Sequence, residues 1–135
     1  MKYHLDTSTV IDVLKFHRES LLNFELTPIQ DIAISSIVAH ELWQGAAEVD
    51  SGSRSRKLLL RFMDAIEVIP FGLKEAETSG SISSYLSKVG KSIGYLDPFI
   101  AGHAITQSAT LVTRNTKHFR LVPGLQIVDW SKHAE

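Results

Sequence analysis

Cysteine is absent from this 135-residue chain, and proline, methionine and tryptophan are scarce. Without thiols the protein can form no disulfide and no thiolate zinc site, and it has no cysteine nucleophile. Long apolar runs are also missing, because no segment approaches the roughly 20 apolar residues that a membrane-spanning helix needs. The composition fits a reducing compartment, and we expect a cytoplasmic protein without membrane association.

Neither sign of charge dominates, and the formal net charge is −1. The overall field of such a chain does not attract a polyanion, so any nucleic acid must be bound by a local basic patch. Basic residues gather in two places, at residues 54–61 and 114–120. A solvated helix face is the more common reason for such a cluster. With 44% hydrophobic residues, the chain can bury one substantial core, which predicts a single domain over residues 1–135.

Short apolar stretches alternate with helical patterns along the chain. Strands are predicted at residues 3–5, 31–35, 67–70, 110–113 and 125–128. Helices are predicted after Asp6, over residues 20–26, after Ser35 or Ser36, over residues 54–63 and 73–89, and from Asp97 onward. This alternation predicts a three-layer α/β/α fold with a central, mainly parallel sheet that binds ligands at the carboxyl ends of its strands.

Several common catalytic motifs are incomplete or absent. Gly90-Lys91-Ser92 resembles the end of a phosphate-binding loop, but Tyr85 stands where the earlier glycine is required. His40-Glu41 begins like a zinc-protease motif, but Gln44 replaces the second histidine. There is no G-x-S-x-G elbow and no G-x-G-x-x-G fingerprint, and the six histidines show no spacing typical of metal ligands.

Three acids, Asp6, Glu41 and Asp97, each stand where a hydrophobic stretch meets a new helix. Taken singly, Asp6 could simply cap its helix, and an aspartate before Pro98 is a common helix start. Glu41 is harder to explain, because its neighbours on the helix face inward. Carboxylates gathered at one end of a sheet repel one another unless a cation or protons intervene, and Mg²⁺ prefers oxygen ligands. Together the three acids predict a magnesium site.

Four segments carry a family resemblance, in the order Tyr3–Ser8, Ile34–Leu42, Ile93–Ala104 and Leu111–Phe119. With their spacing they resemble a PIN domain of the VapC toxin type, and the match spans nearly the whole chain. The ending Val122-Pro123-Gly124-Leu125, followed by Asp129-Trp130, is also similar to that family.

The resemblance implies a PIN-like fold and an Mg²⁺- or Mn²⁺-dependent endoribonuclease that acts as the toxin of a type II toxin–antitoxin pair. It implies RNA as the substrate, a small antitoxin as the partner, and a homodimer. The family's first three acids correspond to Asp6, Glu41 and Asp97. A fourth acid is frequent in relatives, but this chain has Asn115 and His118 in the matching segment, and Ser8 stands where asparagine is frequent.

The resulting hypothesis is metal-assisted hydrolysis of a phosphodiester. Asp6 and Asp97 would hold the ion, and Glu41 would bind it or position a water for in-line attack. Residues expected to support the acids or contact the substrate are Thr7, Ser8, Thr113 and Asn115. Candidates for contacts with RNA phosphates are Arg54, Arg56, Lys57, Lys91, Arg114, Lys117 and His118.

One alternative is a catalytically weak or inactive PIN-like module that binds RNA or a protein. No partner surface can be assigned from the sequence. Trp43, Leu59 and Phe62 are expected to pack in the core rather than to face a partner.

Overall fold

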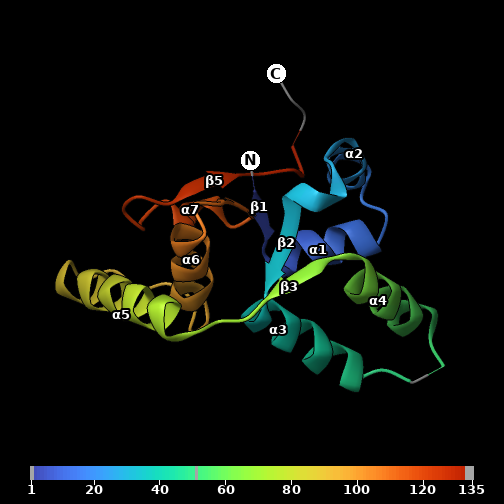
Figure 1. Ribbon diagram of the computed structural model, residues 1–135, viewed down its shortest axis with the longest axis horizontal. Coiled ribbons are helices and arrows are strands. Elements are labelled where there is room, and N and C mark those ends of the chain that lie inside the picture. Colours follow the sequence, from blue (N-terminus) through green and yellow to red (C-terminus); the bar gives the residue numbers. More distant parts are fainter. Residues whose placement is uncertain (1, 51, 133–135) are drawn as a thin grey trace.

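The computed structural model describes residues 2–50 and 52–132, and its centre is a five-stranded parallel sheet (Figure 1). The strands are β1 (Tyr3–Leu5), β2 (Ile32–Ser35), β3 (Glu67–Ile69), β4 (Thr110–Val112) and β5 (Gln126–Val128). Their order across the sheet is β3-β2-β1-β4-β5, and every neighbouring pair is parallel. The central strands β1, β2 and β4 are short and almost wholly buried, as expected for a sheet covered on both faces.

Seven α-helices and one 3₁₀ turn connect the strands within the described residues. They are α1 (Thr7–Leu14), α2 (Arg18–Leu26), η1 (Ile29–Asp31), α3 (Ser36–Ala47), α4 (Arg54–Ala65), α5 (Leu73–Lys88), α6 (Asp97–Thr106) and α7 (Thr116–Phe119). None of these helices is long and apolar enough to cross a membrane.

The chain winds outward from β1 in two directions. The steps from β1 to β2 and β3 carry helices α1–α4, and the return to β4 and β5 carries α5–α7. Because parallel crossovers are right-handed, these two groups of helices cover opposite faces of the sheet, and Figure 1 shows α1 and α4 on one side and α5 and α6 on the other. The direction of winding reverses between β1 and β4, so a crevice is expected at the carboxyl ends of these two strands.

The five predicted strands are confirmed in number and in chain order. The observed limits of the predicted strands and helices differ from the expected ones by at most one or two residues. The second helix begins at Arg18 rather than Ser20, because the ring of His17 accepts a hydrogen bond from the Ser20 N–H at 3.3 Å and so caps the helix. The short elements η1 and α7 were not predicted, since neither is long enough to show a helical period.

The core lies between the sheet and its covering helices. Leu59 and Phe62 belong to it, as expected, whereas the prediction for Trp43 is wrong because its side chain is 39% exposed. Helices α5 and α6 pack closely at Gly102, where an added Cβ would lie 2.9 Å from the backbone nitrogen of Ser79 in α5. The absence of a side chain at Gly102 therefore allows this contact.

Replacing Gly102 by alanine should destabilise the protein, because the new methyl group would overlap backbone atoms that cannot move freely. We expect a loss of about 1–3 kcal/mol in the free energy of unfolding, measured by urea denaturation. Gly80→Ala is the matched control, since nothing lies within 4 Å of a Cβ at that helical position and alanine favours a helix over glycine by roughly 1 kcal/mol. Equal stability of the two variants would contradict this packing.

Candidate metal centre

Asp6 lies at the point where the winding reverses. It follows β1 directly, and the pairing of Leu5 with Val112 places it beside Thr113 at the end of β4. Its carboxylate accepts hydrogen bonds from the Thr7 N–H and from the Thr113 hydroxyl, both at 2.7 Å, and the Ser8 hydroxyl lies 3.4 Å away. The side chain thus caps α1, as one sequence interpretation proposed, and it is also fixed to the neighbouring strand.

The environment of Asp6 opposes its negative charge. Asp6 is only 7% exposed. Burial raises the pKa of its carboxyl group from 3.8 to about 6, against the two hydrogen bonds that lower it, and the negative charges of Asp97 and Glu41 add to the rise. Asp97 and Glu41 therefore lie close enough to Asp6 to influence its ionisation.

Glu41 reaches the same crevice from α3. The Ser35 hydroxyl caps this helix by accepting a hydrogen bond from the Ile37 N–H at 3.1 Å, so Glu41 falls in its second turn. Its carboxylate is half-buried and accepts a hydrogen bond of 2.7 Å from the Thr7 hydroxyl. Thr7 therefore links two of the acids, through its backbone to Asp6 and through its side chain to Glu41.

Asp97 is the first residue of α6 and is fixed by a tight turn over residues 94–97. The Asp97 N–H donates to the Gly94 carbonyl at 3.1 Å, and the Gly94 N–H donates to the Asp97 carboxylate, also at 3.1 Å. A Cβ at Gly94 would lie 2.8 Å from that carboxylate, so a side chain at this position would displace the Asp97 carboxylate. Burial raises the pKa of Asp97, while the bond from Gly94 and the charge of His118 lower it.

Thr113 and Asn115 support the crevice from the end of β4. The Thr113 hydroxyl accepts a hydrogen bond of 3.0 Å from the Asn115 N–H and donates its own hydrogen to Asp6. The Asn115 amide nitrogen lies 3.1 Å from Nδ1 of His118, in α7. The segment that lacks a fourth acid therefore brings an amide and an imidazole toward Asp97.

The donor set fits an open magnesium site better than a closed cage. Among residues 2–50 and 52–132, no three acidic or histidine side chains already form a cluster able to hold a metal ion, and none of the three acids pairs with a Lys or Arg. The acids offer only oxygen ligands, and the pKa of Asp6 is raised mainly by burial, with a smaller contribution from the negative charges of Asp97 and Glu41. Mg²⁺ usually takes one or two carboxylates and keeps several waters, which such a loose arrangement can accommodate.

The predicted basic contacts have different surroundings. Arg114 forms an ion pair of 3.3 Å with the buried Asp12, so its charge is already partly neutralised. The guanidinium of Arg54 lies 6.0 Å from the centre of the Phe16 ring. Lys57, Lys91 and Lys117 are exposed, and His118 is the one whose charge reaches the acids.

Sequence reasoning missed three side chains close to this region. Asp12 is buried and joins Arg114 to the Ser20 hydroxyl at 3.3 Å, which fixes α1 against the loop after β4. His4 and His103 are also buried, with ring centres 5.3 Å apart. Both rings therefore pack in the core, and His133, another of the six histidines, lies outside the described residues.

Comparison with known proteins decides the family. The model of the PIN domain family matches residues 3–125. Ribonuclease VapC2 of Rickettsia felis is 37% identical over 134 residues, which cover 98% of this chain and 100% of that protein. The tRNA(fMet)-specific endonuclease VapC of Salmonella typhimurium is 32% identical, over 96% of this chain and 98% of that protein. This chain belongs to the PIN domain family, and within it to the VapC type.

The fold of this VapC-type chain agrees with solved structures. In the crystal structure of Rickettsia felis VapBC2 bound to a promoter DNA fragment, the similar chain has a TM-score of 0.87 and 34% identity, with 96% of this chain and 99% of that chain covered. The Salmonella typhimurium VapBC complex bound to DNA gives a TM-score of 0.84 at 32% identity, covering 96% and 98% of the two chains. The three-layer fold expected from the sequence is confirmed.

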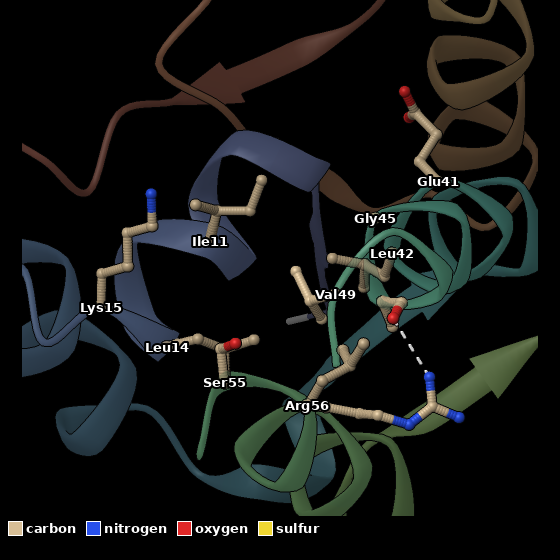
Figure 2. Close-up of a pocket in the computed structure, with 11 residues that line it drawn as sticks. Ile11, Leu14, Lys15, Glu41, Leu42, Gly45, Val49, Ser55 and Arg56 are labelled. Carbon is tan, nitrogen blue, oxygen red and sulfur yellow. Dashed lines mark hydrogen bonds between the residues drawn. The ribbon is translucent and has the colours of Figure 1, made fainter. Parts of the chain in front are cut away.

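Next to the acids, the VapC-type chain has a largely apolar cavity of about 320 Å³ between α1, α3 and α4 (Figure 2). Its apolar wall includes Ile11, Leu14, Leu42, Val49 and Leu59. Figure 2 shows Lys15 and Arg56 at its edges, and Glu41 on its rim with the carboxylate directed away from the apolar side chains. One residue of the acidic crevice therefore borders an apolar groove.

The stability of the metal-free protein should depend on the ionisation of Asp6. Its folded pKa of about 6 lies above the unfolded value near 3.8, so its stabilising contribution is complete below pH 4 and is lost as the pH rises through 6. Asp6→Asn removes this titration. We expect the variant to be more stable than the wild type at pH 7 by up to about 3 kcal/mol, because two pKa units correspond to roughly that energy.

The measurement is denaturant unfolding with chelator present at pH 4, 5, 6 and 7, and the difference between the two proteins should vanish at pH 4. Asp64→Asn, at an exposed position of α4, is the control and should leave the pH dependence unchanged. A constant difference between Asp6→Asn and wild type across this range would contradict the raised pKa.

Proposed function

We propose that this protein is a magnesium-dependent endoribonuclease and the toxin of a type II toxin–antitoxin pair, with Asp6, Glu41 and Asp97 as its catalytic acids. Membership of the VapC type supports ribonuclease activity, since the relatives from Rickettsia felis and Salmonella typhimurium are named as a ribonuclease and a tRNA(fMet)-specific endonuclease. The observation that carries the site assignment is the buried, uncompensated charge of Asp6 beside two further acids. Manganese could replace magnesium at such a site.

The three acids would have different roles in binding the ion and the attacking water. Asp6 and Asp97 would bind the ion, and Glu41, held by Thr7, would bind it or orient the attacking water. Bound Mg²⁺ would polarise the scissile phosphate and lower the pKa of the attacking water. The Thr113 hydroxyl and the Thr7 N–H each hold one oxygen of Asp6, so both oxygens of this ligand have a fixed direction.

The neutral Asn115 favours a single tightly held ion. Asn115 brings an amide where many relatives place an acid, and His118 beside it lowers the pKa of Asp97. A positive or neutral group at this position reduces the attraction for a second cation. The amide of Asn115 and the hydroxyl of Ser8 would instead orient waters around the one ion.

RNA must approach this acidic centre through basic residues around it. His118 is the nearest candidate, since its charge already acts on Asp97, and Lys117 follows from the same short helix. Lys91 precedes the turn that holds Asp97. Arg54 and Lys57 on α4, and Arg114 with its partner Asp12, would contact phosphates farther along the strand.

The apolar cavity bordered by Glu41 is the proposed site of the antitoxin. The structures of VapBC from Rickettsia felis and Salmonella typhimurium are toxin–antitoxin complexes, which supports an antitoxin partner. An apolar segment of that protein would fill the groove, and its position at the rim would block access to Glu41. A homodimer and a cytoplasmic location, both implied by the family resemblance, belong to the same proposal.

Neutralising either metal-binding acid should abolish RNA cleavage. We expect Asp6→Asn and Asp97→Asn to lower the rate by at least about a thousandfold, because each removes a charged ligand of the ion. The assay incubates purified protein with total cellular RNA and Mg²⁺, with and without chelator, and then maps the cut ends. Ends with 5′-phosphate and 3′-hydroxyl groups are expected.

Asp64→Asn is the control for this experiment, because Asp64 is an exposed acid on α4 and should retain full activity. Circular dichroism should show that all three variants fold. Cleavage that persists in both crevice variants would reject the site. A wild-type protein that binds RNA without cutting it under any divalent ion would favour the non-catalytic module instead.

A charge in the apolar groove should release the protein from its antitoxin. Val49→Asp places a carboxylate in the wall of the cavity, and we expect at least roughly tenfold weaker binding of the antitoxin with RNA cleavage retained. Val89→Asp is the matched control, since Val49 and Val89 are 44% and 47% exposed and Val89 follows α5 on the other face of the sheet. Equal antitoxin affinity of the two variants, measured by calorimetry, would contradict the groove assignment.

A further inference from the structure

The turn that positions Asp97 also projects an aromatic side chain into solvent. Tyr95 occupies the second place of the turn 94–97 and is 86% exposed. Its neighbour Leu96 packs against the hydrophobic core. The turn is closed by two hydrogen bonds between Gly94 and Asp97, so the backbone of Tyr95 is held at a fixed place relative to the Asp97 carboxylate.

The ring of Tyr95 is supported from one side only. It meets Phe99 of α6 edge-on, with ring centres 6.2 Å apart and planes inclined at 71°. Phe99 in turn packs edge-on against Phe71, at 5.7 Å and 84°. Phe71 is itself held by its N–H, which donates to the Ser36 hydroxyl at 2.9 Å. The exposed ring thus stands on a short row of aromatic rings anchored to the body of the protein.

An exposed ring in this position lacks a structural explanation within the described part of the chain. The Tyr95 hydroxyl has no hydrogen-bond partner among residues 2–50 and 52–132, and the ring adds little to the core, because most of its surface stays in water. Unpaired RNA bases stack on such aromatic side chains, and every base offers a face for stacking. A base held here would bring its own phosphates next to Asp97.

We propose that Tyr95 is a stacking platform for an unpaired base beside the phosphodiester that the protein cleaves. This inference rests on the proposed ribonuclease function and adds the residue that places the strand. Tyr95 acts by binding the substrate and takes no part in proton transfer. It therefore selects RNA whose cleavage site lies in a single-stranded or looped segment, where a base can leave its neighbours and reach the ring.

The test is a double-mutant cycle between the protein and the RNA. The proteins are wild type, Tyr95→Ala and Tyr95→Phe, with Tyr85→Ala as the matched control, because Tyr85 is a 45% exposed tyrosine on α5. The RNAs are a short single-stranded substrate and a set of copies, each with one abasic residue at a position flanking the cut. The measured quantity is kcat/KM in the presence of Mg²⁺.

We expect Tyr95→Ala to lower kcat/KM on the intact RNA by roughly 5- to 150-fold, the range for loss of one stacked base. On the RNA that lacks the stacked base, Tyr95→Ala and wild type should be equal. Tyr95→Phe should keep the activity within about twofold, because the ring is retained. Tyr85→Ala should behave as wild type on every RNA.

Two results of these kinetic measurements would overturn the proposal. Tyr95→Ala could leave cleavage of the intact RNA unchanged, or it could lower cleavage of all the RNAs by the same factor. The second result would mean that the ring serves the turn or a contact with a second copy of the chain, and sedimentation of Tyr95→Ala would then distinguish these two roles.

Failure of the underlying function would look different from failure of the stacking platform. It would appear as RNA cleavage that Asp6→Asn does not remove, whatever stands at position 95. The RNA affinity of the inactive Asp6→Asn protein, compared with that of the Asp6→Asn/Tyr95→Ala double variant, measures the stacking contact separately from catalysis. Equal RNA affinity of these two proteins would also overturn the platform.

Discussion

The burial of the Asp6 carboxylate at the carboxyl end of β1, with two further acids near it, is the constraint on which the site depends. Asp6 is buried there, and its pKa is raised to about 6 because water is excluded and because Asp97 and Glu41 add negative charge nearby. A fold that tolerates this cost must hold each acid firmly, since each would otherwise turn toward solvent. A divalent cation would relieve the cost and convert the repulsion into binding energy.

Local structure around each acid fixes the position of its carboxylate. Asp6 caps α1, and Asp97 opens α6, so the N-terminal ends of two helices partly offset the negative charge. Thr113 and Thr7 donate their hydroxyl hydrogens to Asp6 and Glu41, respectively. These contacts join residues far apart in sequence, and they fix the acids near the end of the sheet where the reversal of winding predicts ligand binding. The same turn that fixes Asp97 also displays Tyr95, so the positioning of the acid and of the substrate would share one piece of backbone.

The sequence was sufficient to predict the parts of this arrangement that follow from local patterns. Each acid stands at a junction between an apolar stretch and a helix, and parallel strands bring such junctions to one edge, which predicts that Asp6, Glu41 and Asp97 come to the same end of the sheet. The charges of Asp97 and Glu41 do act on Asp6, but within the described residues the three side chains form no group able to hold a metal ion. The polar residues after the strands, Thr7 and Thr113, were predicted as supports and do contact acids.

Features that depend on packing at long range could not be predicted. The pairing of Asp12 with Arg114 joins residues about a hundred positions apart, and no local pattern indicates it. Trp43 was expected in the core, but it lies on an exposed side of α3, where the guanidinium of Arg56 is 5.9 Å from its ring centre. The exposure of Tyr95 was equally hidden, because a tyrosine between Gly94 and Leu96 could face either way until the turn is known.

The most direct test of the central claim is a crystal structure of the protein grown with Mn²⁺, with anomalous diffraction used to locate the ion. Mn²⁺ takes oxygen ligands as Mg²⁺ does and scatters strongly enough to be identified. The account predicts an anomalous peak in the crevice, bonded to carboxylate oxygens of Asp6 and Asp97, with Glu41 as a direct ligand or one water away. A crevice without such a peak, in a crystal saturated with Mn²⁺ near neutral pH, would contradict it.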